Sequence, residues 1–371
     1  MQSKEDKKYD YVIVGAGFFG SVFAYEMQKA GKTCLVLDKR GHIGGNSYTK
    51  NMNGINVHIY GPHIFHTSSE KIWKYVNDLV EFRQYVYSPV ARYKDEVYSL
   101  PFNMWTFNQM WGVKTPAEAE KKLSETIVRC EHPRSLEEFA LSTLGTDVYK
   151  KLICDYTAKH WQKNPKDLPA FIIKRLPFRL TYDANYYNDK YCGIPIGGYT
   201  AIFKKLLENV EVQLNTDFLE CRDKYESMAN KVVFTGKLDE LFDYKYGDLD
   251  YRSLKFEHKT YDYENHQGVV TINHTSDDVP YTRTIEHKFF EGVKTEKTVV
   301  TTETPIKHNR ETVPYYPIND AENNLKFNRY KHDAKKLENY IFGGRLADYK
   351  YYDMHQVIAS ALLKSRKEIS G

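Results

Sequence analysis

Three glycines near the amino terminus stand at a spacing that can expose the backbone to a ligand. Gly15, Gly17 and Gly20 follow a short apolar run, so their G-x-G-x-x-G pattern falls where a strand would enter a helix. The first glycine permits a tight turn, the second lets a pyrophosphate approach the backbone, and the third allows the helix to pack on the strand. Asp38 ends the next apolar run and can accept hydrogen bonds from a ribose. The pattern favours a dinucleotide site over an ordinary strand, turn and helix.

A second glycine turn, at residues 39–46, follows this acid directly. It reads KRGHIGGN and stands where a nicotinamide enzyme would usually proceed to its next helix. In flavoproteins of the glutathione-reductase and amine-oxidase type, such a turn lies along the FAD pyrophosphate. We therefore interpret the site as one for FAD rather than NAD.

Arginine and tyrosine recur in short segments of the second half of the chain. The segment KRLPFR holds Arg175 and Arg179, and Arg283 lies among alternating residues typical of strands. Because a guanidinium can fork onto two phosphate oxygens, we expect Arg175 to bind a diphosphate, whereas Arg179 serves structure. Tyrosine hydroxyls of the segments NYY, PYYP and YKYYD can donate to the same phosphates. Such a ring fits a nucleotide-sugar diphosphate, although each member alone is more often a surface residue.

The segment DYTAKHW, at residues 155–161, ends an expected long helix and holds Tyr156 and Trp161. These aromatic side chains could pack in a core or line a site for a base and a sugar. The arginine-bearing segment that follows favours the second interpretation.

Two histidines, His63 and His66, flank an aromatic residue in the segment GPHIFHT. A metal site is one interpretation, but no carboxylate or cysteine lies nearby at ligand spacing, and we predict none. His63 is expected near the flavin. We interpret His66 as a buried histidine with its hydrogen bonds satisfied.

Composition limits the class of protein. A chain of 371 residues predicts two or three domains. The net charge of +4, from 53 basic and 49 acidic residues, leaves no electrostatic footprint for nucleic acid. Five scattered cysteines without a C-x-x-C pair fit a reduced, cytoplasmic compartment. Because no run of about 18 apolar residues occurs, membrane insertion is not expected.

The hydrophobic pattern predicts the elements that must position these residues. Helices are expected over 69–82, from about 103 to 180 and over 354–369, with a hairpin around residues 94–96. Alternation between 251 and 304, in segments such as TINH, YTRTIEHKFF and KTVVTTE, predicts an antiparallel sheet. Residues 211–214 and 231–235, and the segment YIFGGR at 340–345, predict a return to buried strands.

The fold class that follows is α/β, with a discontinuous Rossmann-like domain that binds FAD, an inserted helical-bundle domain and an antiparallel β-sheet domain. We expect the FAD domain at 1–80, 190–245 and 320–371. The helical domain is expected at 103–189, and the sheet domain at 81–102 and 246–319.

Taken together, these segments resemble a known family. GAGFFG, HIGGNSY, YGPHIFHT, SLPFN, KRLPFR, GIPIGGYT, DVPYTR, EHK, PYYP and GGRL occur in the order and at the spacing of UDP-galactopyranose mutase, over nearly the whole chain. The resemblance implies an isomerase that converts UDP-galactopyranose to UDP-galactofuranose, a precursor for cell-surface polysaccharide.

The family mechanism implied by the resemblance uses reduced FAD as a nucleophile. N5 attacks the anomeric carbon, UDP is expelled, and the sugar opens and recloses through another hydroxyl. The flavin must be reduced by NAD(P)H or another reductant, yet no net electron transfer occurs. A homodimer is left open.

The resemblance also assigns residues. Tyr156 would stack on the base, Trp161 would line the sugar pocket, and Asn273 would help to hold the nucleotide. Arg175 and Arg283 are the expected catalytic arginines, with His63 beside the flavin, and the loop that carries Arg175 would close over substrate. The tyrosines that would grip the diphosphate are Tyr186, Tyr316 and Tyr351. The residues expected to bind the cofactor are Gly15, Gly17, Phe18, Gly20, Asp38, Lys39, Gly45, Asn46, His63, Ile64, Arg345, Tyr352 and Asp353.

Three departures from the family pattern leave the sugar and the base open. His160 stands where relatives commonly have glutamine, Tyr87 replaces an asparagine near the sugar, and Leu152 replaces an aromatic near the base. The alternatives are the same chemistry on dTDP-fucopyranose or UDP-N-acetylgalactosamine. More remote alternatives are a flavin amine oxidase or desaturase, and a protein that binds the ligand without turnover.

Overall fold

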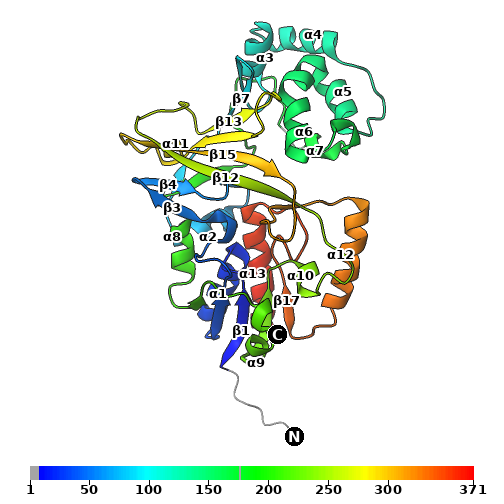
Figure 1. Ribbon diagram of the computed structural model, residues 1–371. Helices are drawn as coiled ribbons and strands as arrows, with labels where there is room; N and C mark the ends of the chain where they lie inside the picture. Colours follow the sequence, from blue (N-terminus) through cyan, green and yellow to red (C-terminus); the bar gives the residue numbers. More distant parts are fainter. Residues whose placement is uncertain (1–7, 175–176) are drawn as a thin grey trace.

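The computed structural model describes residues 8–174 and 177–371. Its lower half is a five-stranded parallel sheet in the order β10-β2-β1-β11-β17 (Figure 1). The apolar runs of the sequence form its strands because both faces of the sheet are covered by helices. The strands are β1 (Tyr9–Val14), β2 (Cys34–Leu37), β10 (Glu211–Gln213), β11 (Ala229–Phe234) and β17 (Tyr340–Phe342).

Two helices from opposite ends of the described chain lie together on one face of this sheet. They are α1 (Phe18–Lys29) and α13 (Met354–Ser370), and α8 (Tyr199–Leu206) packs beside α1 (Figure 1). The opposite face is covered by α12 (Ala321–Ala334), α10 (Leu238–Leu241) and α9 (Arg222–Ser227). The nucleotide fold is therefore assembled from three separated parts of the chain.

A seven-stranded sheet lies above the nucleotide fold, in the order β16-β12-β15-β14-β13-β7-β8 (Figure 1). The strand pairs formed within 251–304 are antiparallel, as predicted, whereas β13 runs parallel to β7, which comes from an earlier part of the chain. The strands are β7 (Val90–Tyr93), β8 (Glu96–Ser99), β12 (Tyr251–Tyr261), β13 (Thr271–His274), β14 (Arg283–Glu286), β15 (Thr298–Ile306) and β16 (Tyr316–Pro317).

One segment that was expected to continue as strand is helical. The alternating pattern of YTRTIEHKFF gives β14 and then a short helix, α11 (Lys288–Glu291). Phe290 is fully buried there and stacks on His58, with ring centroids 4.2 Å apart. The burial of the Phe290 ring favours the helical conformation of residues 288–291. The alternation of apolar and polar residues along the sequence does not predict this burial.

The helical region stands apart at the top of the molecule (Figure 1). Thr115 and Ser135 cap two of its helices, each in a reciprocal pair with a glutamate three residues on, and these capping boxes fix where the helices begin. The helices are α3 (Met104–Trp111), α4 (Pro116–Thr126), α5 (Leu136–Val148), a π-helical turn η2 (Tyr149–Cys154), α6 (Asp155–Trp161), the 3-10 turn η3 (Pro165–Asp167) and α7 (Phe171–Lys174).

Two small sheets join these parts. The strands β3 (Thr49–Met52) and β4 (Ile55–His58) form a hairpin, and β5 (Phe65–Thr67), β9 (Tyr191–Pro195) and β6 (Phe82–Gln84) form the order β5-β9-β6. The helix α2 (Glu70–Leu79) and the 3-10 turns η1 (Gly45–Ser47) and η4 (Leu219–Cys221) complete the chain. Among the described residues, no helix combines the length and apolar character that crossing a bilayer requires.

Candidate functional site

The predicted glycine turn lies at the carboxyl end of β1, where it leaves no room for side chains. Gly15 has a φ of +105°, and a Cβ on it would lie 2.2 Å from Oγ1 of Thr235. A Cβ on Gly20 would lie 2.0 Å from the carbonyl oxygen of Gly15. Both positions therefore require glycine, in agreement with the roles of a turn and of close helix packing.

The second glycine turn faces the first. A Cβ on Gly45 would lie 3.1 Å from the Cα of Gly17, and Gly44 donates its N–H to the carbonyl of Ala16 over 2.9 Å. Two bare stretches of backbone thus line the same groove, next to the amino terminus of α1. A helix amino terminus with exposed N–H groups is suited to a pyrophosphate.

Asp38 locks the two turns together. Its carboxylate accepts N–H hydrogen bonds from Ala16 and Arg40, both over 2.9 Å, and the residue is buried. Arg40 in turn donates through Nη2 to Oδ1 of Asn46 over 3.0 Å. Nη1 of Arg40 is buried and has no hydrogen-bond partner among the described residues. An orphaned guanidinium nitrogen beside two glycine turns fits an anionic cofactor.

The groove collects most of the residues expected to bind the cofactor. Those that line it are Gly15, Gly17, Phe18, Asp38, Lys39, Gly45, Asn46, His63 and Arg345. Four others lie outside this lining: Gly20, Ile64, Tyr352 and Asp353. Gly20 acts through packing, and Tyr352 contributes its carbonyl, which accepts from Nη2 of Arg345 over 2.6 Å.

Further groove residues were missed in the sequence. Thr216 and Asp217 follow β10, and Gly236 follows β11, so all three lie at the carboxyl edge of the sheet. Ligands of open α/β sheets bind at this edge. The sequence therefore held a signal for these residues, because any residue that directly follows a predicted strand of the parallel sheet is a candidate for binding the ligand.

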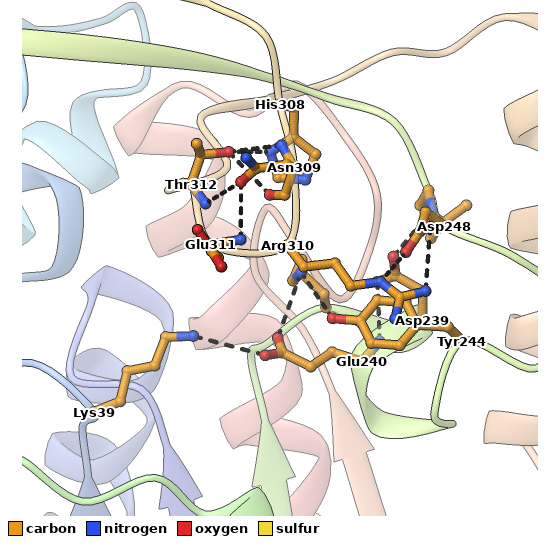
Figure 2. A network of polar contacts seen from close by, with 12 residues as sticks. Lys39, Asp239, Glu240, Tyr244, Asp248, His308, Asn309, Arg310, Glu311 and Thr312 are labelled. Atoms are coloured by element: carbon orange, nitrogen blue, oxygen red, sulfur yellow. Dashed lines mark hydrogen bonds and ion pairs between the residues drawn. The ribbon is translucent and has the colours of Figure 1, made fainter.

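A polar network braces the rim of the groove (Figure 2). Lys39 lies 3.8 Å from Glu240, which also pairs with the buried Lys237 at 3.7 Å. Arg310 lies over the ring of Tyr244 at 3.8 Å and donates two hydrogen bonds to Asp248. The network ties the nucleotide fold to the loop at 308–312, which leads into β16.

His63 lies between this groove and the seven-stranded sheet. Its Nδ1 is 2.7 Å from the carbonyl of Gly61, and its backbone N–H donates to Nδ1 of His58 over 3.1 Å. Burial, together with the charges of Arg345 and Arg283, lowers the pKa of His63 to about 4. The imidazole is therefore neutral at physiological pH.

Directly opposite positions on neighbouring strands bring the next three residues together. Asn273 is opposite Arg283, and Arg283 is opposite Glu303, so all three side chains share one face of the seven-stranded sheet. Arg283 forms a two-point ion pair with Glu303, at 2.8 Å from Nε and 2.7 Å from Nη2. Glu303 is fully buried and fixes the guanidinium in place.

Tyrosines lie around Arg283 and Arg345. Tyr316 and Tyr351 stack with ring centroids 4.7 Å apart, and Arg345 lies over the two rings at 5.3 and 5.9 Å. Burial raises the pKa of Tyr156 and of Tyr316, while Arg283 acts in the opposite direction on both. The hydroxyls therefore stay protonated and can donate.

Trp161 contacts an arginine that was not expected from the sequence. The guanidinium of Arg252 lies 3.7 Å from the centroid of the indole ring. Burial lowers the pKa of Arg252 to about 9, so it stays charged, and its Nε is buried with no hydrogen-bond partner among the described residues. Arg252 lies opposite Tyr316 in the sheet. The alternation of β12 predicts that Arg252 shares one face of its strand with every second residue. It does not predict that this face meets Glu303, because the pairing of the strands cannot be determined from the alternation alone.

Four further residues singled out in the sequence remain to be placed. Tyr186 packs against Tyr87 and Tyr187, with ring centroids 5.5 and 5.4 Å apart. Tyr87, the departure from the family pattern, is buried. Arg175 lies outside the described residues. Arg179 pairs with Asp183 at 2.5 Å.

A Rossmann-type groove that opens toward a basic, tyrosine-lined face is the arrangement of a dinucleotide-dependent enzyme. Comparison with known proteins supports this class and narrows it. The sequence model of UDP-galactopyranose mutase matches residues 151–351, and that of the NAD(P)-binding Rossmann-like domain matches residues 13–79. The chain belongs to the UDP-galactopyranose mutase family of isomerases.

Relatives of known name span nearly the whole chain. A probable UDP-galactopyranose mutase of Klebsiella pneumoniae is 40% identical, over 97% of this chain and 94% of the relative. A dTDP-fucopyranose mutase of Escherichia coli is 38% identical, over 96% and 99%.

Solved structures with low sequence identity share the fold. The structure of a reduced UDP-galactopyranose mutase matches with a TM-score of 0.76 and 13% identity, over 98% of this chain and 94% of the other. Putrescine oxidase bound to putrescine matches with a TM-score of 0.57 and 12% identity, over 98% and 99%.

Proposed function

We propose that this protein is a flavin-dependent mutase that interconverts the pyranose and furanose forms of a nucleotide sugar, with UDP-galactose as the leading substrate. One observation carries the proposal beyond family membership. Arg283 and Arg252 lie on one buried, tyrosine-lined face beside His63 and Arg345, which line the cofactor groove. An oxidase acting on an uncharged or cationic substrate has no need of these arginines.

The cofactor in this proposal is FAD in its reduced form, held between the two glycine turns. When bound, a reduced flavin supplies a nucleophilic nitrogen, which accounts for a covalent step without net electron transfer. The orphaned Nη1 of Arg40 and the bare backbone at Gly15, Gly17 and Gly45 fit its pyrophosphate. NAD(P)H or another cellular reductant would maintain the reduced state.

The residues of the sheet would bind and orient the substrate. Arg283 would hold the diphosphate and stabilise its negative charge as the sugar departs, because its pairing with Glu303 preorganises the guanidinium. Arg175, carried by the segment outside the described residues, is proposed to close over the other side. Tyr186, Tyr316 and Tyr351 would donate hydroxyl hydrogen bonds.

Further contacts would set the nucleotide and the sugar. We propose that Tyr156 stacks on the base, that Trp161 lines the sugar pocket and that Asn273 holds the nucleotide. His63 is neutral and would act beside the flavin as a hydrogen-bonding group rather than as a cation. The free thiols of the five cysteines fit a cytoplasmic enzyme, and a homodimer is the simplest assembly.

Which sugar the protein uses needs a direct assay, because the UDP-galactopyranose mutase and the dTDP-fucopyranose mutase above are almost equally similar to this chain in sequence. Reduced protein is incubated in parallel with UDP-galactofuranose, UDP-N-acetylgalactosamine and dTDP-fucopyranose, and ring interconversion is followed by chromatography. The proposal expects turnover with at least one, and fastest with the UDP-galactose pair. Turnover of none would overturn it, and binding without turnover would indicate a binding protein.

An amine oxidase is the competing enzyme class, since putrescine oxidase shares the fold. It would consume oxygen in proportion to the amine that it oxidises. Its turnover per folded, flavin-loaded molecule would also not depend on Arg283. Oxygen uptake with putrescine, unchanged in Arg283→Ala, would favour that class over a mutase.

A further inference from the structure

Three side chains outside the lining of the cofactor groove meet at the join between β5 and α13, although one of them, Asp353, was expected to bind the cofactor. His66 comes from β5, while Asp353 and His355 come from the start of α13. One donor atom from each lies within 4.8 Å of the others, and all three residues are half-buried. The expectation of no metal was based on the neighbours of His66 along the chain, whereas the fold brings in a carboxylate and an imidazole from almost 300 residues away.

His66 is held in the orientation of a metal ligand. Its Nδ1 is 2.7 Å from Oδ2 of Asp189, whose other oxygen accepts the hydroxyl of Ser68 over 2.8 Å. In a neutral imidazole, a carboxylate on Nδ1 favours the tautomer that carries its proton there, in which Nε2 has the lone pair. The ring of Tyr187 stacks on the imidazole at 3.9 Å and fixes its plane. Metal-binding histidines characteristically have such a carboxylate on the other nitrogen.

His355 supplies the second imidazole. Its Nδ1 is buried and has no hydrogen-bond partner among the described residues, which is costly unless a ligand satisfies it. Its ring lies edge-on to that of His66, with centroids 5.5 Å apart. Asp353 is anchored by its backbone N–H, which donates to Oε1 of Gln356 over 2.9 Å, and its carboxylate adds an oxygen donor to the two imidazoles.

We propose that His66, Asp353 and His355 form a binding site for a divalent transition-metal ion of the zinc class, with Asp189 orienting His66. Two histidines and one carboxylate are a ligand set that zinc uses with water in the remaining position. Zinc–nitrogen distances of about 2.0–2.1 Å require donors roughly 3.4 Å apart, so modest side-chain rotations close the shell. The imidazole nitrogens select against Mg²⁺, which prefers oxygen ligands.

An ion at this site would join α13 to β5 beside the cofactor groove. Met354, between the two α13 ligands, lines that groove. Its Sδ accepts a hydrogen bond from the hydroxyl of Ser47 over 3.8 Å. Metal binding would therefore hold one wall of the groove in place, and the free energy of binding would add to the stability of the folded chain.

The test is a calorimetric titration of ZnCl₂ into the flavin-loaded protein after treatment with a chelator. We expect one zinc ion per chain with a micromolar or lower Kd. His355→Ala should weaken binding by more than about 10-fold and Asp189→Asn by about 10–100-fold. His332→Ala, at an exposed position of α12, is the matched control and should bind as the wild type does. Absence of saturable binding, or equal affinity in His355→Ala, would overturn the proposal.

A thermal melt gives a second readout that does not depend on the variants folding. Saturating zinc should raise the Tm of the wild-type chain, whereas the same concentration of Mg²⁺ should not. An unchanged Tm with zinc would count against the site.

Discussion

Arg283 is held by its ion pair with the buried Glu303. Variants of the two residues can therefore separate the effect of Arg283 on stability from its effect on turnover. We predict that Arg283→Ala lowers turnover by about 10²–10³-fold, because in the proposed function this guanidinium stabilises the charge on the departing diphosphate. It should also destabilise the fold by about 3–5 kcal/mol, since Glu303 would remain buried without a counter-charge. Steady-state kinetics and urea unfolding measure the two effects, and flavin absorbance should show that FAD stays bound.

The control for Arg283 is a double variant. Arg283→Ala with Glu303→Gln removes the unpaired charge, so we expect it to recover much of the stability and none of the turnover. Arg366→Ala, at an exposed position of α13, should change neither quantity. Recovery of turnover in the double variant would show that Arg283 acts only through the fold.

The buried His287 should make the stability of the fold depend on pH. His287 is buried, its Nε2 lies 2.6 Å from Oγ1 of Thr301, and burial lowers its pKa to about 3. In the unfolded chain the imidazole of His287 is protonated below about pH 6.5, whereas in the native chain it stays neutral. The free energy of unfolding therefore falls as pH drops below that value. At pH 5 this histidine should cost on the order of 2 kcal/mol.

The measurement is the free energy of unfolding at several pH values between 7 and 5. The slope of the free energy of unfolding against pH reports how many more protons the unfolded chain binds than the native chain. In His287→Gln this number should be smaller by up to one between pH 7 and pH 5. An unchanged slope would mean that the imidazole is protonated in the folded protein.

The need for glycine in the first turn can be tested by comparing two glycines that flank helix α1. Gly15→Ala would place a methyl group 2.2 Å from Oγ1 of Thr235 in a left-handed backbone, so FAD binding should be lost or weakened at least about 10-fold. Gly31 also has a positive φ, of +75°, but a Cβ there would meet no described atom within 4 Å. Gly31→Ala should cost about 1 kcal/mol and leave FAD bound. Flavin release on dialysis distinguishes the two.

Helix α6 is fastened to the loop between β13 and β14 by one lysine. Nζ of Lys159 donates to the carbonyls of His274, Ser276, Val279 and Tyr281, over 2.6 to 3.2 Å. Lys159→Met should therefore destabilise the chain by about 2–3 kcal/mol and raise the KM for the nucleotide sugar more than it lowers kcat. The exposed Lys166→Met is the control for the melt and the kinetics. Equal KM values would show that the loop does not help to bind substrate.

At the scale of the whole molecule, the sequence predicted the parts whose causes are local. Apolar runs ending in glycine indicated the strands and turns around Gly15 and Gly45, and capping boxes indicated the helix starts at Thr115 and Ser135. The sequence did not predict Arg252 beside Trp161, the parallel pair of β13 and β7, or the helix α11. These features depend on which strands become neighbours and which rings are buried. The roles of the site residues stay predictions until substrate is seen bound.

In the proposed function the flavin serves ring interconversion and not net oxidation, and one measurement tests this directly. Protein reduced with dithionite under anaerobic conditions is mixed with excess UDP-galactofuranose, while the flavin spectrum and the sugar products are recorded together. We predict many turnovers to the pyranose form with the flavin still reduced, and no product with oxidised protein. Absence of conversion by the reduced protein, or flavin oxidation in step with product, would show that the protein is not such a mutase.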